Sequence, residues 1–576
     1  MKRKINQTRL AAVLALAVFC CSLNFGISTA AQETRQQKTG EKPTPKQTPT
    51  PKQTPTPAPT ATPSPILTPT ATPVPVQTVA DLQARIRQTL SRPEIRRGKI
   101  GVKVVSLDTG KTVFEENAEK YFMPASNMKS FTIAAALEKL SPDFRFVTSV
   151  YAPAMPDASG TIRGDLTVYG RGDVSYSAAF YDGDYLKGLD ALAAKIAQSG
   201  VKRIEGNLVG DESYFTGSAI PSGWEWDDLQ WYYGATVSAL TLDDNSLDLS
   251  VKPSSAAGAP CAVQLLPLNS VMRVVNHCAT APSSAKRDLQ VFKKLDQNTL
   301  EISGTMPVGD KDYKASIAVS QPAEFFLSAL RQLLMQKGVV ITGQNRVVGA
   351  KDKINLAAAS TVAPVEITKL ESPPLSLITA KTLKPSQNLY TETILRALGE
   401  QMKTLSAQNA PTIVQASPVN LLPDNPYLNP KAESDARGLF AVQNFLREVG
   451  IAPDGVLQYD GSGLSRHNLV TPASAVQLYS FMARSRYANV WRDALPIGAV
   501  DGTLKNRFVG TAAANNVRAK TGTIDQVSAL SGYVTTASGE RFVFSTIVND
   551  VADGRLRQAV IDEIVVALAN FNGKTN

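Results

Sequence analysis

The sequence predicts an α/β fold in which a single sheet takes strands from both ends of the chain. Residues 99–106 alternate between apolar and polar side chains, which is typical of a strand. Strand patterns return in three segments near the C-terminus, at 516–521, 528–536 and 541–549. Between these ends, residues 144–364 are also rich in strand patterns. We therefore expect one α/β unit, formed by residues 81–143 and 365–576, with a strand-rich insertion over 144–364.

Turn and helix signals predict the remaining elements. The turn Asp108-Thr109-Gly110-Lys111 leads from the first strand into a second one near Val113. Residues 405–430 contain five prolines and are predicted to form an extra loop, to which we assign no function. Eight helices are predicted, at 81–96, 131–140, 186–198, 322–337, 388–403, 433–449, 471–484 and 555–571.

Two histidines and four cysteines among 576 residues exclude several kinds of active site. A Ser-His-Asp or Cys-His site would need His277 or His467, and no two histidines lie four apart, as a His-Glu-x-x-His zinc site requires. We expect no metal or organic cofactor. Of the net charge of +10, residues 1–30 carry +4 and residues 31–80 carry +3, which leaves about +3 for the rest. That part has no basic block with interleaved aromatic residues, so a nucleic-acid partner is not expected.

Residues 1–30 are typical of a secretory signal peptide. A basic start precedes an apolar run over residues 10–23, and the small residues Ser28 and Ala30 fit cleavage after Ala30. An uncleaved anchor is the less favoured alternative, because the run is shorter than the roughly 20 residues that span a bilayer.

Residues 31–80 are predicted to form a disordered linker. Twelve prolines lie between Pro43 and Pro75, and the hexapeptide that starts at Thr44 repeats at once. Such a sequence favours polyproline II at about 3.1 Å per residue, so it could reach on the order of 100 Å. A spacer that holds the folded part away from a surface and a tail without a role are equally consistent with it.

Two of the four cysteines, Cys20 and Cys21, would leave with the signal peptide. Cys261 and Cys278 remain, 17 positions apart. In an exported protein such a pair favours a structural disulfide.

Three short motifs follow one another along the predicted α/β unit, and the first is Ser126-Asn127-Met128-Lys129, which opens an apolar helix. Residues i and i+3 share a helix face, so the Lys129 amine can reach the Ser126 hydroxyl. A lysine acts as a base only if its pKa falls, and burial beside another cation has that effect. This chemistry needs no histidine.

The second motif is Ser386-Gln387-Asn388, and the third is Lys520-Thr521-Gly522-Thr523 on a predicted strand. The edge of that strand could align with an extended peptide, and Gly522 would keep the edge bare for its backbone. Lys520 adds positive charge, and the threonine hydroxyls of the third motif can hold a carboxylate.

Each motif is a weak signal alone. Roughly two Ser-x-x-Lys are expected by chance in a chain of this length, and Ser283-Ser284-Ala285-Lys286 is a second one. The order of the three motifs and their predicted helix and strand context favour a catalytic set. Ser-x-x-Lys, Ser-x-Asn and Lys-Thr-Gly together are typical of β-lactamases and penicillin-binding proteins.

With these motifs the sequence resembles the penicillin-recognising serine enzymes, and more closely the D-alanyl-D-alanine carboxypeptidase/endopeptidase family of the penicillin-binding protein 4 type. About 260 residues separate Ser126 from Ser386, as in relatives with domains inserted there. Asp460-Gly461-Ser462-Gly463-Leu464-Ser465 resembles a family signature, and Gly172-Asp173 and Gly210-Asp211 resemble the inserted domain. The resemblance covers roughly residues 81–576. It implies a transpeptidase/β-lactamase-like domain whose antiparallel sheet is flanked by helices.

The resemblance also implies a mechanism. Ser126 would attack the carbonyl between the two terminal D-alanines of a peptidoglycan stem peptide, or a D-alanyl cross-link, with Lys129 as general base. Backbone N–H groups of Ser126 and Thr523 would form the oxyanion hole. Ser386, held by Asn388 and Lys520, would relay a proton to the leaving amine, while Thr521 and Thr523 hold the terminal carboxylate. Water would then release the acyl group, and β-lactams would acylate the same serine.

Three further residues need an interpretation. Asp173 is a candidate for binding the amine of the stem side chain, and an ordinary turn aspartate is an equal alternative. Asp525 lies two residues past Thr523, where some relatives carry a neutral amide, so the preferred stem peptide is left open. Ser462 is interpreted as part of a glycine turn and not as a nucleophile.

Two other functions are weighed against the carboxypeptidase. A β-lactamase needs a positioned water for fast deacylation, but we identify no acid for that step, and the large insertion is unlike a compact lactamase. A catalytically idle wall-binding scaffold is disfavoured by the three intact motifs. The expected location is the periplasm or another site outside the cytoplasm. The expected partners are peptidoglycan stem peptides and inhibitory β-lactams, and a loose association with the membrane or cell wall is left open.

Overall fold

The computed structural model of this chain describes residues 75–268, 271–295, 297–352, 363–408, 429 and 431–576. The predicted signal peptide, residues 31–74 of the predicted linker, and residues 409–428 and 430 of the predicted extra loop lie outside these ranges. Within the described part of the chain, no helix is both long enough and apolar enough to cross a membrane.

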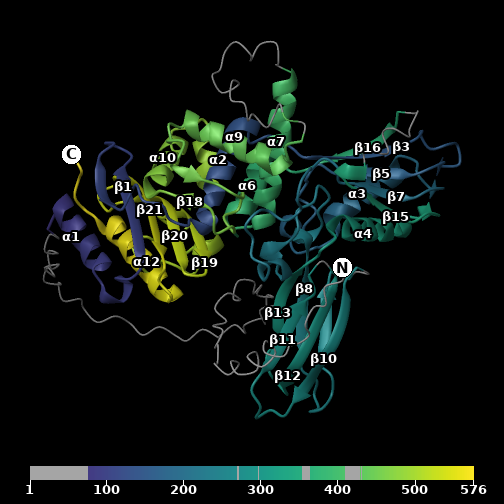
Figure 1. The fold of residues 1–576 in the computed structure, drawn as a ribbon, viewed down its shortest axis with the longest axis horizontal. Helices are drawn as coiled ribbons and strands as arrows, with labels where there is room; N and C mark the ends of the chain where they lie inside the picture. The colour runs from purple at the N-terminus through teal and green to yellow at the C-terminus, as the bar shows by residue number, and fades with distance from the viewer. Residues whose placement is uncertain (1–74, 269–270, 296, 353–362, 409–428, 430) are drawn as a thin grey trace, which may run out of the picture. The chain divides into compact units, whose positions relative to one another are not determined.

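The part of the described chain outside the insertion contains a five-stranded antiparallel sheet. Both ends of the chain contribute strands to it, as the sequence predicts (Figure 1). β1 lies beside β21, with Lys99 opposite Asn549 and Ser106 opposite Phe542. The strand that carries the third motif, β19, is at one edge of the sheet. In sheet order the strands are β19 (Arg518–Ile524), β20 (Val527–Thr535), β21 (Arg541–Asn549), β1 (Lys99–Ser106) and β2 (Thr112–Glu116).

Helices cover both faces of this sheet, so its inner strands β20 and β21 are buried on both sides. Along β21, Phe542 and Phe544 belong to the core beneath the two terminal helices, α1 (Val79–Leu90) and α12 (Gly554–Asn570). Val543 and Ile547 belong to the core on the opposite face. This division follows from the alternation of side chains along a strand.

The helix α1 begins at Val79, two residues earlier than predicted. Thr78 explains the difference, because it forms a capping box with Asp81. The Thr78 backbone N–H donates to Asp81 Oδ2 at 2.8 Å, and the Asp81 N–H donates to Thr78 Oγ1 at 3.2 Å.

The second face of the sheet is covered by a helical layer built around α2 (Met128–Leu140), in which every residue from Met128 to Leu137 is buried. The prediction missed two short helices, at Leu375–Leu383 and Ala488–Ala494. It also placed residues 405–408 in the extra loop, which is wrong, because α7 continues to Gln408. No proline lies between Asn388 and Pro411, so no proline breaks the helix before Gln408. The other helices and the small hairpin of this layer are α6 (Leu375–Leu383), α7 (Asn388–Gln408), α9 (Ser434–Glu448), α10 (Pro472–Met482), α11 (Ala488–Ala494), β17 (Val456–Leu457) and β18 (Leu469–Val470).

The insertion between α2 and α6 has its own core. One part of it consists of a mixed five-stranded sheet, a second small sheet and two helices (Figure 1). Its last strand, β16, pairs with β3, with Glu371 opposite Val147. The sheet order is β15 (Asn345–Val348), β7 (Leu208–Asp211), β5 (Leu166–Tyr169), β3 (Val147–Ala152) and β16 (Val365–Glu371). The small sheet and the helices are β14 (Val340–Ile341), β6 (Arg203–Ile204), β4 (Thr161–Ile162), α3 (Lys187–Gln198) and α4 (Pro322–Gln336).

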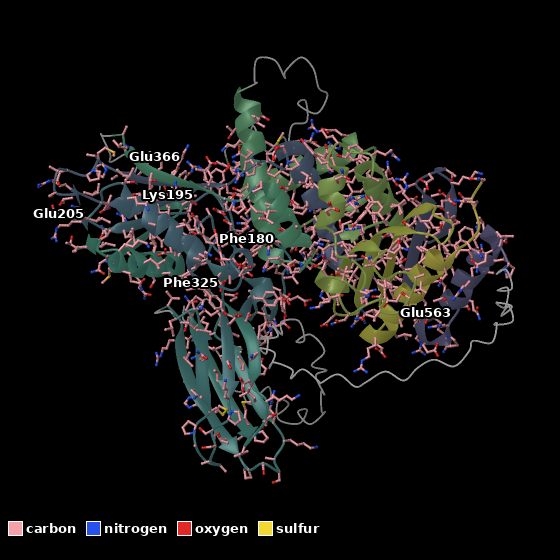
Figure 2. All side chains as sticks on the ribbon, turned by 180° about the vertical axis from the view of Figure 1, so that it is seen from behind. Phe180, Lys195, Glu205, Phe325, Glu366 and Glu563 are labelled. Atoms are coloured by element: carbon pink, nitrogen blue, oxygen red, sulfur yellow. A yellow bond between two sulfur atoms is a disulfide. The ribbon has the colours of Figure 1, made fainter. Side chains whose placement is uncertain are left out.

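Two three-stranded sheets complete the insertion, in the orders β13-β8-β9 and β10-β12-β11. Their strands are β8 (Ser246–Lys252), β9 (Ala262–Leu266), β10 (Arg273–Ala281), β11 (Asp288–Lys293), β12 (Thr299–Pro307) and β13 (Tyr313–Ala318). Elsewhere, the insertion contacts the helical layer directly. The ring centre of Phe180 (Figure 2) lies 6.0 Å from that of Tyr390 on α7. The Lys381 amine lies 5.9 Å from the ring centre of Phe180.

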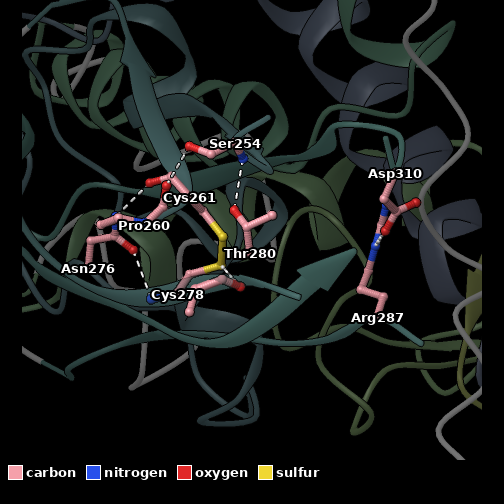
Figure 3. The surroundings of a disulfide bond; sticks show 9 residues. Ser254, Pro260, Cys261, Asn276, Cys278, Thr280, Arg287 and Asp310 are labelled. Atoms are coloured by element: carbon pink, nitrogen blue, oxygen red, sulfur yellow. Dashed lines mark hydrogen bonds and ion pairs between the residues drawn. A yellow bond between two sulfur atoms is a disulfide. The ribbon is translucent and has the colours of Figure 1, made fainter. Parts of the chain in front are cut away.

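The predicted disulfide between Cys261 and Cys278 is confirmed and lies between these two sheets (Figure 3). Both cysteines are buried, and the Cys261 N–H donates to the Cys278 carbonyl at 2.9 Å. The Asn276 amide donates to the Cys261 carbonyl at 2.9 Å. The bond therefore ties the start of β9 to the middle of β10, far from the three motifs in the sequence.

Replacing both cysteines by serine is expected to lower the free energy of unfolding of the insertion by about 3 kcal/mol, because the loop that the bond closes regains its freedom in the unfolded chain. Denaturant unfolding with and without the bond measures this difference. Acylation of the protein by a penicillin at 25 °C should stay as in the native chain, and an unchanged unfolding midpoint would contradict the prediction.

Candidate active site

The first motif lies where a turn enters α2. Ser126 is in a short 3₁₀ turn, Ala125–Asn127, and Lys129 follows in the first turn of the α-helix. The Lys129 amine donates to Ser126 Oγ at 2.8 Å, which is the contact expected from their spacing. The lysine is fully buried, whereas the serine is partly exposed, so the hydroxyl can meet a ligand that the amine cannot reach directly.

The second motif joins α6 to α7 and brings both of its polar side chains to the same place. Ser386 has a φ of +65°, a left-handed conformation that the Gln387 N–H stabilises by donating to the Thr382 carbonyl at 2.9 Å. Asn388 opens α7 and accepts a hydrogen bond from the Lys129 amine at 2.5 Å. The Asn388 amide N–H donates to the Tyr233 carbonyl at 2.8 Å, so a residue of the insertion fixes which end of the amide faces the lysine.

The third motif completes the cluster from the edge of the sheet. The Lys520 amine donates to Ser386 Oγ at 2.8 Å and to the Thr521 carbonyl at 2.9 Å. Thr521 is buried and donates to Thr503 Oγ1 at 2.8 Å, whereas Thr523 is exposed on the edge strand. Seven of the eight predicted site residues are therefore near one another, on three segments of the chain.

Gly522 has a different reason to be glycine than the one we expected. We expected it to keep the strand edge bare for a substrate. A Cβ at this position would instead lie 2.3 Å from the Pro124 carbonyl oxygen, two residues before Ser126. The glycine therefore lets the first and third motifs pack against each other.

The eighth predicted residue, Asp173, forms its hydrogen bonds with Ser175 and Thr241 and not with the other seven residues. Its carboxylate is 2% exposed and accepts hydrogen bonds from the Ser175 N–H at 2.8 Å and the Ser175 hydroxyl at 2.7 Å. Burial raises its pKa to about 6. A substrate amine would have to open this segment to reach it, and its role in binding stays a prediction.

The sequence reasoning missed several groups around Lys129. The Ser462 carbonyl accepts a third hydrogen bond from the lysine amine, at 2.8 Å. The carboxylates of Glu392 and Asp460 are buried close by. The family signature singled out Asp460 and Ser462 but gave them no role, and the position of Glu392 one turn after Asn388 was the signal available for it.

Burial sets the protonation of both lysines. It lowers the pKa of Lys129 to about 7, although the carboxylates of Asp460 and Glu392 act in the opposite direction. Burial and then the charge of Lys129 hold the pKa of Lys520 well below its usual range. A lysine with a pKa near neutrality can accept a proton from a neighbouring hydroxyl.

The hydrogen bonds of Lys129 also orient it. The amine binds the side-chain amide oxygen of Asn388 and the backbone carbonyl oxygen of Ser462. Both oxygens accept hydrogen bonds but cannot donate them. A neutral amine has two hydrogens and one lone pair. If the two hydrogens bind these carbonyls, the lone pair is left for the hydroxyl of Ser126, which is what a general base for that serine requires.

The insertion borders this cluster. The Trp224 indole N–H donates to Asp460 Oδ2 at 2.9 Å, and Arg466 donates to the Asp525 carbonyl at 3.2 Å and to Glu225 at 2.7 Å. Asp525 itself is largely exposed beside the third motif. Within the described residues, no group of three or more His, Cys, Asp or Glu side chains is arranged to hold a metal ion.

A partly exposed serine, a buried lysine of lowered pKa, and a second serine held by a second lysine define a serine acyl-transfer site of the penicillin-recognising type. A family model described as the D-Ala-D-Ala carboxypeptidase 3 (S13) family matches residues 82–417 and 428–571. The chain belongs to this family. The resemblance stated from the motifs is confirmed, and with it the predicted class of enzyme, a serine D-Ala-D-Ala carboxypeptidase.

Individual relatives agree with the family match. The chain is 32% identical over 506 residues to a D-alanyl-D-alanine carboxypeptidase of Actinomadura sp. (strain R39), which covers 86% of each chain. It is 25% identical over 461 residues to the D-alanyl-D-alanine carboxypeptidase DacB of Haemophilus influenzae, which covers 79% of this chain and 86% of the relative.

The solved structures confirm the predicted fold. A crystal structure of penicillin binding protein 4 from Haemophilus influenzae matches with a TM-score of 0.68 and 23% identity, over 87% of this chain and 100% of that one. A crystal structure of the same protein complexed with a β-lactam matches with a TM-score of 0.63 and 21% identity, over 86% of this chain and 98% of the other. The α/β fold with a sheet-rich insertion is therefore shared with these proteins.

Proposed function

We propose that this chain is an exported D-Ala-D-Ala carboxypeptidase and DD-endopeptidase that hydrolyses peptidoglycan stem peptides through an acyl-enzyme on Ser126, and that β-lactams inhibit it. The observation that carries the proposal is the pair of serine–lysine contacts in one place. Lys129 is 2.8 Å from Ser126, and Lys520 is 2.8 Å from Ser386. The family match and the names of the relatives support the substrate class.

Acylation starts from the hydroxyl of Ser126. The neutral amine of Lys129 takes the hydroxyl proton while Ser126 Oγ attacks the carbonyl carbon of the penultimate D-alanine. The backbone N–H groups of Ser126 and Thr523 stabilise the oxyanion that develops, because such donors act most strongly where charge appears in the transition state. Thr523 is exposed on the edge strand, where an extended peptide can lie beside it.

The leaving group then needs a proton. Ser386 donates its hydroxyl proton to the amine of the departing D-alanine and regains a proton from Lys129, which took one from Ser126. Lys520 contacts Ser386, and Lys129 contacts Asn388 of the same motif. Thr521 and Thr523, on the same strand as Lys520, bind the terminal carboxylate. Water attacks the ester in the second half of the reaction, releases the shortened stem peptide and restores Ser126.

The same proposal includes the place of action and the domain organisation. Residues 1–30 direct export, and the proline-rich linker lets the folded part stay loosely associated with the membrane or the cell wall while it reaches the peptidoglycan. The insertion extends from β3 to β16, and the rest of the folded chain forms the penicillin-binding part. The pairing of β16 with β3 supports this boundary, which is several residues later than the predicted end at residue 364.

Release of free D-alanine from a stem pentapeptide tests the proposal. The native chain should release one D-alanine per pentapeptide, and it should hydrolyse a D-alanyl cross-link in a dimeric stem peptide if it also acts as an endopeptidase. No release by a folded chain that still binds peptidoglycan would favour the idle scaffold.

The lifetime of a penicillin adduct separates the carboxypeptidase from a β-lactamase. An adduct that lasts for hours is expected here, because the two carboxylates that interact with Lys129 in the described part of the chain, Glu392 and Asp460, are buried and already accept backbone N–H groups of residues 461–465. An adduct that disappears within seconds, with rapid turnover of the penicillin, would assign the chain as a β-lactamase.

A further inference from the structure

The turn formed by residues 460–465 contacts the first motif at Ala125, next to the candidate nucleophile, and at Lys129. Gly463 has a φ of +84°, and a Cβ there would lie 1.9 Å from the Ala125 carbonyl oxygen, next to Ser126. The Asp460 carboxylate organises the turn from within by accepting the N–H groups of Gly463 at 2.7 Å and Ser465 at 2.8 Å. The turn is therefore tightly built and in contact with the first motif.

A carboxylate on α7, outside the turn, binds the backbone of the turn. Glu392 lies on α7, one turn after Asn388, and is 1% exposed. Its Oε2 accepts the Gly461 N–H at 3.0 Å, and its Oε1 accepts the Ser462 N–H at 2.7 Å. A carboxylate can accept two successive backbone N–H groups in this way, whereas an amide has only one acceptor oxygen.

Ser462, whose backbone N–H Glu392 holds, is also the residue whose carbonyl contacts Lys129. The Ser462 N–H binds the carboxylate, and the Ser462 carbonyl accepts a hydrogen bond from the Lys129 amine. This carbonyl and that of the Asn388 amide are the two acceptors that leave the lone pair of a neutral Lys129 directed at Ser126. A shift of the turn would remove one of these acceptors and let the amine rotate.

We propose that Glu392 is a positioning residue for the general base: it fixes the Gly461–Ser462 backbone so that the Ser462 carbonyl orients the Lys129 amine toward Ser126. The inference rests on the proposed function, since it assigns a task within the same acylation step. Glu392 does not touch the substrate in this account and acts only through the turn and the lysine.

The charges around the lysine give the proposal a measurable signature. Asp460 from the turn, Glu392 from α7 and Lys520 from β19 are the charged groups that interact with Lys129, and the two carboxylates favour its protonated form. Burial and then the charge of Asp460 raise the pKa of Glu392 to about 7, while Arg396, one turn further along α7, acts in the opposite direction, so Glu392 carries its negative charge above this pH. Loss of the Glu392 charge is therefore expected to lower the pKa of Lys129.

The experiment measures the rate of acylation by a chromogenic cephalosporin as a function of pH, for the full chain and three variants. The native rate should fall as the pH drops through about 7, because Lys129 is then protonated. In Glu392→Gln the maximal rate is expected to fall about 10- to 100-fold through misplacement of the base. Its acid limb should also move to lower pH by about one unit, because a nearby negative charge is gone.

Two more variants separate positioning from general damage. Glu392→Asp keeps the charge but shortens the side chain, so its rate should fall while the acid limb stays near the native position. Glu400→Gln is the matched control, because Glu400 is a second buried carboxylate on α7 that binds Arg437 and Ser434 and has no contact with the turn. It is expected to lower the melting temperature and to leave the acylation rate and the pH profile unchanged.

Each outcome decides the proposal. Native rates in Glu392→Gln or in Glu392→Asp would overturn it, and so would a lower rate in Glu392→Gln without any shift of the acid limb, since that is what a merely structural residue gives. If Glu392→Gln does not fold, Glu392→Asp carries the test alone. Failure of the native chain to be acylated would instead overturn the proposed function, which keeps the two apart.

Discussion

A chain in which Ser126 is replaced by alanine is expected to form no covalent adduct with penicillin and to release no measurable D-alanine from a stem pentapeptide. The hydroxyl is the atom that forms the acyl bond, and no other hydroxyl is bound to Lys129 in the described part of the chain. Of the two nearby serines, Ser462 is fully buried, and Ser386, which is bound to Lys520, has the proposed role of proton relay to the leaving amine.

The second Ser-x-x-Lys of the sequence offers a control for this variant. Ser283 and Lys286 have the same spacing as the catalytic pair but lie at an exposed tip of the insertion. Ser283→Ala should bind penicillin and release D-alanine as the native chain does. Labelling of Ser126→Ala with a fluorescent penicillin, seen on a denaturing gel, would show that another residue is the nucleophile.

The Lys129→Met variant is expected to lose about three orders of magnitude in the rate of acylation. Removal of a general base costs typically 10²–10⁴-fold, and here the same side chain also binds Asn388 and Ser462. Methionine has a similar length and suits a fully buried position, so the packing of α2 should be retained. The stopped-flow rate of β-lactam acylation and the melting temperature are measured together.

The pH dependence gives a second view of the same variant. The native rate should fall below about pH 7, where Lys129 becomes protonated, whereas the residual rate of Lys129→Met should lack that acid limb. Lys286→Met in the exposed motif is the matched control and should behave as the native chain. A Lys129→Met chain that is acylated within tenfold of the native rate would rule out the lysine as the base.

The sequence alone allowed much of this site to be predicted, because its chemistry lies in short motifs. Ser126 and Lys129 are three residues apart on a predicted helix, so their contact follows from local geometry. The convergence of the second and third motifs on this pair could be inferred from the motif set and the resemblance, but not from local geometry. It depends on strands from both ends of the chain pairing in one sheet, over more than 400 residues of separation.

The residues that the sequence reasoning missed act through tertiary contacts. Glu392 on an amphipathic helix has the same local pattern as a solvated glutamate, and only its contact with a turn about 70 residues later shows its role. Gly522 was interpreted as an adaptation to substrate, yet the Pro124 carbonyl from the other end of the chain occupies the space beside it. Neither distance could be obtained from spacing along the sequence.

Intact-mass analysis of the penicillin-treated native chain, followed by mapping of the modified peptide, tests the central claim most directly. Opening of the β-lactam ring adds the whole inhibitor without a leaving group, so one inhibitor mass per chain is expected. We predict that this mass is found on the peptide containing Ser126 and that it persists for hours. A modification on a different peptide, or none on a correctly folded chain, would contradict the account.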